Sequence, residues 1–392
     1  MNVRTRRGPA AVLLGLLCLL PPLQAAAQAT AAVAIAPATR VRVVVVASGL
    51  EHPWAVAPLP GDDPAAGWLV TERPGRLRLV SRDGRVGPAL AGLPPVDARG
   101  QGGLLDVVLH PGHASNRLVY WSYSEAGDGA SNGTAVARGR LDLAGQRLED
   151  VQVVFRQQPK VDSSAHFGSR LVFDRSGRLF VTLGDRFSRK DDAQQPGNHL
   201  GKIVRIEADG RAPTDTPAPV APGALPELWS WGHRNVQGAA LHPDSGELWA
   251  TEHGPQGGDE LNRVERGRNH GWPVITYGRH YGIGTRIGEG ERRADVVEPL
   301  RVWRPTSIAP SGLAFVTSPR YPGWQGSLLL GALRGQALLR LTLAGTRVVQ
   351  EERLLESRGE RIRDVRQGPD GWIYLLSDRS DGQLLRLVPE SP

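Results

Sequence analysis

Cysteine is nearly absent from this 392-residue chain, whose single cysteine, Cys18, falls in an N-terminal apolar run. If that run is a cleaved leader, the mature protein has no thiol and cannot form a disulfide. Exported proteins often depend on disulfides for stability. This one is therefore expected to depend on a large core or on a bound metal ion.

Blocks of lysine or arginine are also missing, although the formal net charge is +7. Residues 1–29 hold three arginines and no acidic residue, so removing them lowers the formal charge to +4. A mild positive charge spread along the chain gives no sign of nucleic-acid binding and favours anionic small ligands.

The N-terminus has the three regions of a secretory signal peptide. Three arginines precede the apolar run AAVLLGLLCLL, and cleavage after Ala27 or Ala29 fits the small-residue rule. The run stops at Pro21 and is shorter than the roughly 20 residues that span a bilayer, which argues against stable membrane insertion. We predict a signal peptide at 1–29, a linker at 30–40 and a periplasmic location, with a twin-arginine route as an open alternative.

Long helical patterns are missing from the rest of the chain, whereas glycine (48) and proline (31) are abundant. One unit recurs instead: an apolar strand, a turn rich in proline, aspartate and glycine, and a second apolar strand. Copies begin at Val56, Val107, Leu171, Ala240, Ala314 and Val365.

Six such units, about 45 to 80 residues apart, are best explained by a closed ring that leaves only short, protected edges. The sequence predicts an all-β fold, a six-bladed β-propeller with long inter-blade loops that forms a single catalytic domain over 41–392. A pair of β-sandwiches is the alternative.

Polar residues recur at the same place in these units, just before the first strand or just after the second. In a blade both places lie on one rim, so these side chains are expected to face a shared mouth. They are Gln101, His166, Asp185, Arg234, Asn235, Arg334, Arg361 and Arg363.

The fourth unit concentrates candidate chemistry, with GHRN just before it and the loop GPQGGDE just after it. Arg234 is a permanent planar cation suited to a carboxylate or a developing oxyanion. Asp259 and Glu260, with the carbonyls of Gly254 and Pro255, offer the hard oxygen ligands that Ca²⁺ prefers. The alternative is an ordinary solvated turn, because the spacing is not that of an EF-hand.

Seven motifs follow one another along the chain: GQGGLLDVVLHP, HFGSRLVFDRSGRLFVTLGD, HLGKIVRI, WGHRNVQG, EHGPQGGDELN, NHGWP and RIRDV. Together they resemble the soluble quinoprotein aldose dehydrogenases of the glucose/sorbosone dehydrogenase family, from about Gly49 to Leu387. The resemblance implies a six-bladed propeller, pyrroloquinoline quinone (PQQ) and Ca²⁺ as cofactors, and oxidation of aldose sugars at C1 to lactones.

The resemblance also implies catalytic roles. His166 matches the general base that takes the proton of the C1 hydroxyl, and Asp185 matches the carboxylate that orients its imidazole. Arg234 matches the arginine near the quinone C5 oxygen, where negative charge develops as hydride arrives.

Cofactor contacts follow in the same way. Besides His166 and Arg234, the amides of Gln101 and Asn235 match neutral contacts to the quinone. Arg361 and Arg363 match the arginines that hold its carboxylates. Arg334 stands where the best-known glucose oxidisers of the family have a lysine.

For calcium, the carbonyls of Gly254 and Pro255 match ligands of the ion that clamps the quinone. Asp259, Glu260 and the carbonyl of His270 match a second, structural calcium site, although which loop atoms serve which ion stays open. His270 itself stands where the family usually has a tyrosine.

Two other functions stay open from the sequence: a calcium-dependent lactonase-type hydrolase, and a non-catalytic sugar-binding propeller. The partners expected for the dehydrogenase are a small aldose and an unidentified electron acceptor, a quinone or a cytochrome. A homodimer is an open alternative to a monomer.

Overall fold

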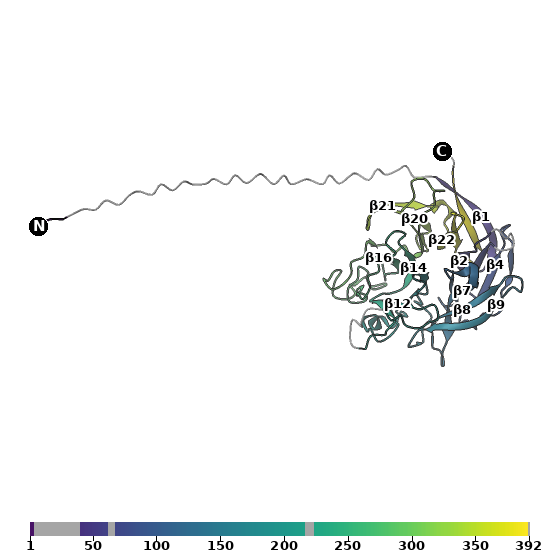
Figure 1. Cartoon of the computed structure of the whole chain (residues 1–392), viewed down its shortest axis with the longest axis horizontal. Coiled ribbons are helices and arrows are strands. Elements are labelled where there is room, and N and C mark those ends of the chain that lie inside the picture. Colours follow the sequence, from purple (N-terminus) through teal and green to yellow (C-terminus); the bar gives the residue numbers. More distant parts are fainter. Residues whose placement is uncertain (4–39, 62–66, 216–222, 391–392) are drawn as a thin grey trace. The chain divides into compact units, whose positions relative to one another are not determined.

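The computed structural model describes residues 1–3, 40–61, 67–215 and 223–390. Apart from its first three residues, the predicted signal peptide lies outside these ranges, as does nearly all of the predicted linker. Pro37–Pro392 is one compact unit, described here by itself (Figure 1). No helix in the described ranges is long and apolar enough to cross a membrane.

Within the described residues, 24 strands form six four-stranded antiparallel sheets, the blades of a propeller. The first three blades are β2 (Pro53–Pro58), β3 (Trp68–Glu72), β4 (Arg76–Val80) and β5 (Val86–Ala89); β6 (Leu104–Leu109), β7 (Leu118–Ala126), β8 (Asn132–Asp142) and β9 (Arg147–Arg156); and β10 (Leu171–Phe173), β11 (Leu179–Thr182), β12 (Lys202–Ile206) and β13 (Leu228–Trp231). The next two are β14 (Val236–Leu241), β15 (Leu248–Glu252), β16 (Asp259–Arg263) and β17 (Arg301–Trp303); and β18 (Pro310–Phe315), β19 (Leu328–Ala332), β20 (Ala337–Ala344) and β21 (Arg347–Leu354). The sixth is β22 (Ile362–Gln367), β23 (Ile373–Ser377), β24 (Gly382–Pro389) and β1 (Val41–Leu50). Short helical turns are α1 (His113–Asn116), η1 (Lys190–Gln194) and η2 (Glu356–Arg358).

The first strand of each blade packs against the first strand of the next, from β2 through β6, β10, β14 and β18 to β22 and back to β2. The ring is therefore closed around a central axis (Figure 1). The sixth blade takes its outermost strand, β1, from the start of the propeller, where Val43 pairs with Leu387. The predicted six-bladed β-propeller is confirmed.

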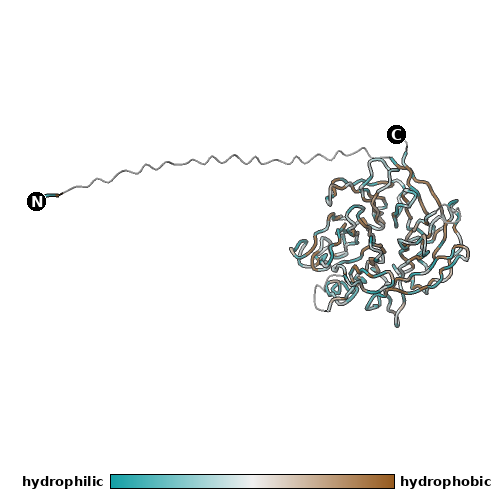
Figure 2. The backbone as a smooth tube through the Cα atoms, viewed as in Figure 1, coloured by the Kyte–Doolittle hydropathy of each residue, from teal (hydrophilic) through white to brown (hydrophobic). Residues whose placement is uncertain are grey.

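Each predicted hairpin forms the first and second strands of one blade; the copy from Val107, for example, supplies β6 and β7. The irregular spacing arises from the outer strands and from long connections such as 264–300, which joins β16 to β17. Figure 2 shows hydrophobic stretches along the strands and hydrophilic stretches in many connecting loops.

Apolar side chains of neighbouring blades meet to form the core. Between the first two blades, Trp54 and Leu77 pack in one buried cluster with Val107 and Trp121. The first two strands of the first blade, β2 and β3, are buried along nearly their whole length. Burial on both faces holds such inner strands rigidly, so the loops at their ends present polar side chains from a stable frame.

Candidate active site

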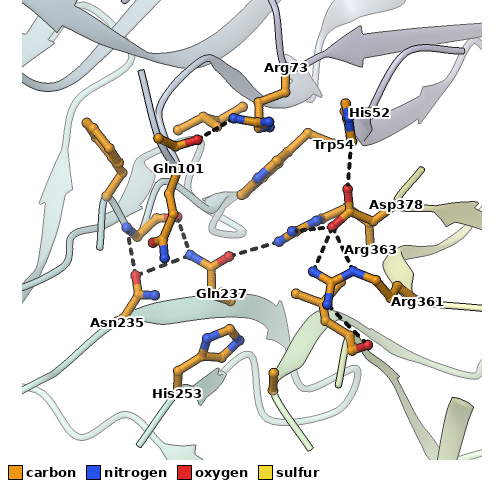
Figure 3. Close-up of a pocket in the computed structure, with 16 residues that line it drawn as sticks. His52, Trp54, Arg73, Gln101, Asn235, Gln237, His253, Arg361, Arg363 and Asp378 are labelled. Carbon is orange, nitrogen blue, oxygen red and sulfur yellow. Dashed lines mark hydrogen bonds and ion pairs between the residues drawn. The ribbon is translucent and has the colours of Figure 1, made fainter. Parts of the chain in front are cut away.

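A pocket of about 510 Å³ lies where the loops of the six blades converge (Figure 3). Its lining comes from residues just before or within the first strand of a blade, or just after the second. They are His52, Trp54, Arg73, Gly100, Gln101, Leu105, Phe167, Gly168, Asn235, Gln237, His253, Ala309, Leu333, Arg361, Arg363 and Asp378.

Two guanidinium groups share one carboxylate on one side of this pocket. Arg361 and Arg363 both donate to Oδ2 of Asp378, at 3.0 and 2.9 Å, and Nδ1 of His52 lies 3.4 Å from Oδ1 (Figure 3). Burial alone would raise the pKa of Asp378, but the charges of the two arginines hold that pKa well below its ordinary value. Asp378 is therefore ionised, and it holds both guanidinium groups at the wall of the pocket.

Positive charge exceeds negative charge in this pocket. Arg73, which donates to the carbonyl of Gly100, adds a third guanidinium to the lining, against the single carboxylate of Asp378. Nε of Arg363 is buried and has no hydrogen-bond partner among the described residues. Such a site fits a small molecule with several carboxylates, because guanidinium groups form strong, often bidentate hydrogen bonds with carboxylates.

Beside the pocket, a buried histidine and a buried aspartate form a pair. Nδ1 of His166 lies 2.7 Å from Oδ1 of Asp185. The same carboxylate accepts hydrogen bonds from the backbone N–H of Phe187 and from Nε1 of Trp272, each at 2.8 Å. The backbone N–H of His166 donates to Oε1 of Gln101, which ties the pair to the pocket wall.

The charge states of this pair follow from its surroundings. Burial opposes ionisation of Asp185, but its hydrogen bond with His166 and the nearby positive charges leave its pKa lowered. Burial lowers the pKa of His166, with a further contribution from the charge of Arg234, and the hydrogen bond to Asp185 opposes this only in part. The carboxylate can only accept, so Nδ1 carries the proton and Nε2 keeps a free lone pair, as a general base requires.

Arg234 joins this pair through a shared tryptophan. Its guanidinium carbon lies 5.3 Å from the ring centroid of Trp272, whose Nε1 binds Asp185. Nη1 donates to the carbonyls of His253 and Gly254, at 3.0 and 2.6 Å. Nε is buried without a partner in the described part of the chain. A fixed cation with one unused donor therefore stands next to the histidine–aspartate pair.

The structure thus groups most residues predicted at the mouth. His166, Asp185 and Arg234 form one buried cluster, and Gln101, Asn235, Arg361 and Arg363 line the adjoining pocket. Arg334, by contrast, does not line this pocket. Its side chain is exposed and borders a separate hollow of about 700 Å³, although the preceding Leu333 lines the pocket.

The carboxylate of Asp259 joins two blades through hydrogen bonds. Oδ2 accepts hydrogen bonds from the hydroxyl of Ser307 and from the backbone N–H groups of Ile308 and Ala309, while Oδ1 accepts from the N–H of Gly254. The three bonds to Oδ2 hold the fourth blade to the fifth, whereas Oδ1 accepts one bond within its own blade and keeps a lone pair. Pro255, next to Gly254, is buried in the same loop.

Glu252 and the predicted Glu260 form an acidic pair close to Arg234. Nδ2 of Asn262 bridges Oε1 of Glu252 and Oε2 of Glu260, at 3.0 and 3.1 Å. The neighbouring His270 stacks on His233, with ring centroids 4.5 Å apart. Both ring nitrogens of His270 and Oδ1 of Asn262 are buried without partners among the described residues.

Glu252, Glu260 and His270 line a hollow of about 10 Å³, room for about one water-sized occupant. Burial and the neighbouring Glu252 carboxylate raise the pKa of Glu260 well above its ordinary value. Within the described ranges, no cluster of three or more histidine, cysteine, aspartate or glutamate side chains could hold a metal ion. A cation here would therefore need backbone carbonyls as well, which Ca²⁺ accepts.

The sequence prediction missed several residues of the pocket and one residue, Glu252, of the small hollow. Asp378 follows the second strand of the sixth blade just as Asp185 follows that of the third, so the positional rule was sufficient to find it. Trp54 and Gln237 lie in first strands whose apolar or mixed character gave no such sign. Glu252, at the end of β15, looks like an ordinary strand residue.

Comparisons with known proteins agree with this geometry. The sequence model of the glucose/sorbosone dehydrogenase family matches residues 50–386. Aldose sugar dehydrogenase YliI of Escherichia coli K12 is 45% identical over 358 residues, which cover 91% of this chain and 95% of the relative.

Solved structures extend the likeness to three dimensions. A crystal structure of a glucose dehydrogenase is 51% identical, with a TM-score of 0.85, and the match covers 89% of this chain and 100% of that one. The PQQ-bound form of aldose sugar dehydrogenase from Streptomyces coelicolor is 30% identical, with a TM-score of 0.72, covering 90% and 100% of the two chains. On its sequence, its six-bladed ring and the residues at its mouth, this chain belongs to the glucose/sorbosone dehydrogenase family.

Proposed function

We propose that this protein is a PQQ-dependent aldose dehydrogenase that oxidises sugars at C1 to lactones in the periplasm. The observation that carries the proposal is the imidazole of His166, held by Asp185 beside a pocket with an excess of guanidinium groups. The PQQ-bound relative from Streptomyces coelicolor supports the choice of cofactor. The predicted leader at 1–29 supports export.

The chain's own residues would move the proton of the reaction. Nε2 of His166 accepts the proton of the C1 hydroxyl, and Asp185 stabilises the imidazolium that forms. The C1–H bond breaks with both electrons leaving as hydride, so the sugar becomes a lactone. When bound, PQQ supplies the hydride acceptor and Ca²⁺ the Lewis acid beside it.

Binding of the cofactor would fall to the cationic wall. Arg361 and Arg363, oriented by Asp378, would hold its carboxylates, with Gln101 and Asn235 as neutral contacts. Arg234 would stabilise negative charge that develops next to its guanidinium group. Arg334 would reach the cofactor only if its exposed side chain turned inward.

Calcium would bind at two places. The carbonyls of Gly254 and Pro255, next to Arg234, would hold the ion near the quinone. Glu252, which is buried, and the half-buried Glu260, with the carbonyl of His270, would hold a structural ion, because two adjacent carboxylates are stabilised by a cation between them. Asp259 would join this set through Oδ1, which accepts a single hydrogen bond, from the N–H of Gly254.

Reconstitution tests the proposal. Purified protein incubated with PQQ and Ca²⁺ should reduce an artificial dye when glucose or another aldose is added, and neither cofactor alone should suffice. Lactone hydrolysis with Ca²⁺ and no quinone would indicate the hydrolase instead. If no aldose in a broad panel supports dye reduction after full reconstitution, the proposed dehydrogenase activity is wrong.

We predict the acid limb of the pH profile from the lowered pKa of His166. The base works only when deprotonated, so kcat/KM should hold its plateau down to a pH below 6.5, the ordinary histidine value, and fall as the pH drops through the lowered pKa. Arg234→Gln removes one cause of the lowering and should move this limb to higher pH. A limb at or above pH 6.5 in the parent enzyme would contradict the assignment of His166.

We predict that Ca²⁺ stabilises the fold through the buried acidic pair. At about 100 times its Kd, Ca²⁺ should raise the unfolding temperature by about 5 °C, and a chelator should reverse the rise. Glu260→Gln should abolish most of this response. Glu291→Gln, which alters a more exposed glutamate paired with Arg304, is the matched control and should keep it. An equal response in both variants would place the ion elsewhere.

A further inference from the structure

An exposed phenylalanine stands next to the proposed base. Phe187 is 55% exposed, and its ring meets that of His166 edge-on, with centroids 5.2 Å apart. Its φ is +64°, and that of the preceding Arg186 is +58°. Two consecutive non-glycine residues in the left-handed region cost free energy, and a bulky aromatic is a poor choice for that conformation.

The surrounding residues force this conformation on the chain. The guanidinium group of Arg186 is buried and donates to the carbonyls of Ala165, Asn132 and Ser163 and to Oδ1 of Asn132. It also lies 3.8 Å from the ring centroid of Phe167. With Arg186 held inside, the next residue must project outward.

The backbone N–H of Phe187 donates to Oδ1 of Asp185. The turn therefore fixes the phenylalanine ring relative to the histidine–aspartate pair. Asparagine or glycine would suit the same backbone without strain and without exposing an apolar ring. A phenylalanine here is therefore better explained by something that it contacts outside the folded chain.

We propose that Phe187 is a substrate-binding residue whose ring forms the apolar platform for the aldose substrate. A pyranose carries C–H groups on its faces and hydroxyls at its edge, so an aromatic ring can contact the face while a polar group binds one hydroxyl. With the C1 hydroxyl at His166, the sugar ring lies within reach of Phe187. This inference rests on the function proposed above.

The platform has a consequence for substrate range. Contact with a sugar face does not read individual hydroxyl groups, so it favours aldoses as a class over one epimer. Tyr281 places a second exposed ring at the mouth, and its hydroxyl lies 3.4 Å from Nη2 of Arg234. Truncation of Phe187 should therefore weaken the binding of several aldoses by similar factors.

Steady-state and single-turnover kinetics of the reconstituted holoenzyme test the platform. Phe187→Ala and Phe187→Asn should raise KM for glucose, xylose and galactose by about fivefold to tenfold each, with kcat within about twofold. Phe187→Trp should keep KM near the parent value. Leu143→Ala truncates another exposed apolar side chain, outside the site, and should change nothing.

A stability measurement separates this role from a structural one. Because asparagine suits the left-handed region, Phe187→Asn should unfold at a temperature no lower than the parent while its KM rises. A lower unfolding temperature with weaker PQQ binding would make Phe187 a structural residue and overturn the proposal. An unchanged sugar KM with a raised KM for the electron acceptor would also overturn it, in favour of acceptor docking.

Failure of the proposed function would be recognised separately. If the reconstituted parent reduces no dye with any aldose, sugar binding can still be measured by saturation-transfer NMR with glucose as the probe. Binding by the parent and its loss in Phe187→Ala, but not in Leu143→Ala, would support the platform without turnover. Equal binding by all three would overturn it.

Discussion

Replacing His166 with glutamine is expected to lower kcat for every aldose by about 10²- to 10⁴-fold, the usual contribution of a general base. Glutamine keeps a neutral polar side chain of similar length, but it cannot take a proton. The loss should appear in the step that reduces the bound cofactor, which a single-turnover experiment isolates. PQQ affinity, from an absorbance titration, should change by less than about threefold, because His166 contributes no charge to the pocket.

Two further variants sharpen this prediction. Asp185→Asn should also lower kcat, because the amide neither fixes the proton on Nδ1 nor stabilises the imidazolium. His199→Gln is the matched control: His199 is another buried histidine, with Nε2 2.8 Å from Oε1 of Glu227, but it does not line the pocket. A parent-like kcat in His166→Gln, or an equal loss in His199→Gln, would rule out His166 as the base.

Replacing Arg363 with methionine is expected to weaken PQQ binding by about 100-fold. Its side chain is only 12% exposed, pairs with Asp378 at 2.9 Å and has a buried, unused Nε–H, so its loss removes a charged contact that water replaces poorly. Methionine keeps much of the aliphatic volume, so the fold should persist. Equilibrium dialysis or an absorbance titration measures the change directly.

The matched control for this prediction is a substitution of Arg353 on the neighbouring fifth blade. Arg353 forms an ion pair with Glu356 at 2.6 Å and borders the separate hollow beside Arg334 rather than the pocket. Arg353→Met should leave PQQ affinity unchanged. If both variants weaken PQQ equally, overall positive charge rather than the pocket would explain binding.

Local pattern was sufficient to predict the first two strands of each blade. Strands such as β6 and β7 are apolar and adjacent in sequence, joined by residues 110–117, which include α1, so their pairing can be predicted from one short stretch of sequence. Outer strands were harder. In β21, with the sequence RVVQEERL, half-buried and exposed positions mix polar and apolar residues, so no clear alternation remains.

The site was predictable where chain position alone decides geometry. His166, Arg234 and Arg361 precede first strands, and ring closure brings such positions together. Contacts between blades were not predictable in this way. The hydrogen bond from the N–H of Ile308 to Oδ2 of Asp259 spans 49 positions of the chain, and nothing in GGDE signals that this carboxylate joins two blades.

A crystal structure of the protein with PQQ and Ca²⁺ tests the central claim most directly. We predict the quinone in the pocket of Figure 3, with its carboxylates on Arg361 and Arg363 and its ring within reach of a sugar bound at Nε2 of His166. PQQ bound outside this pocket, or in it with no carboxylate on either arginine, would contradict the claim.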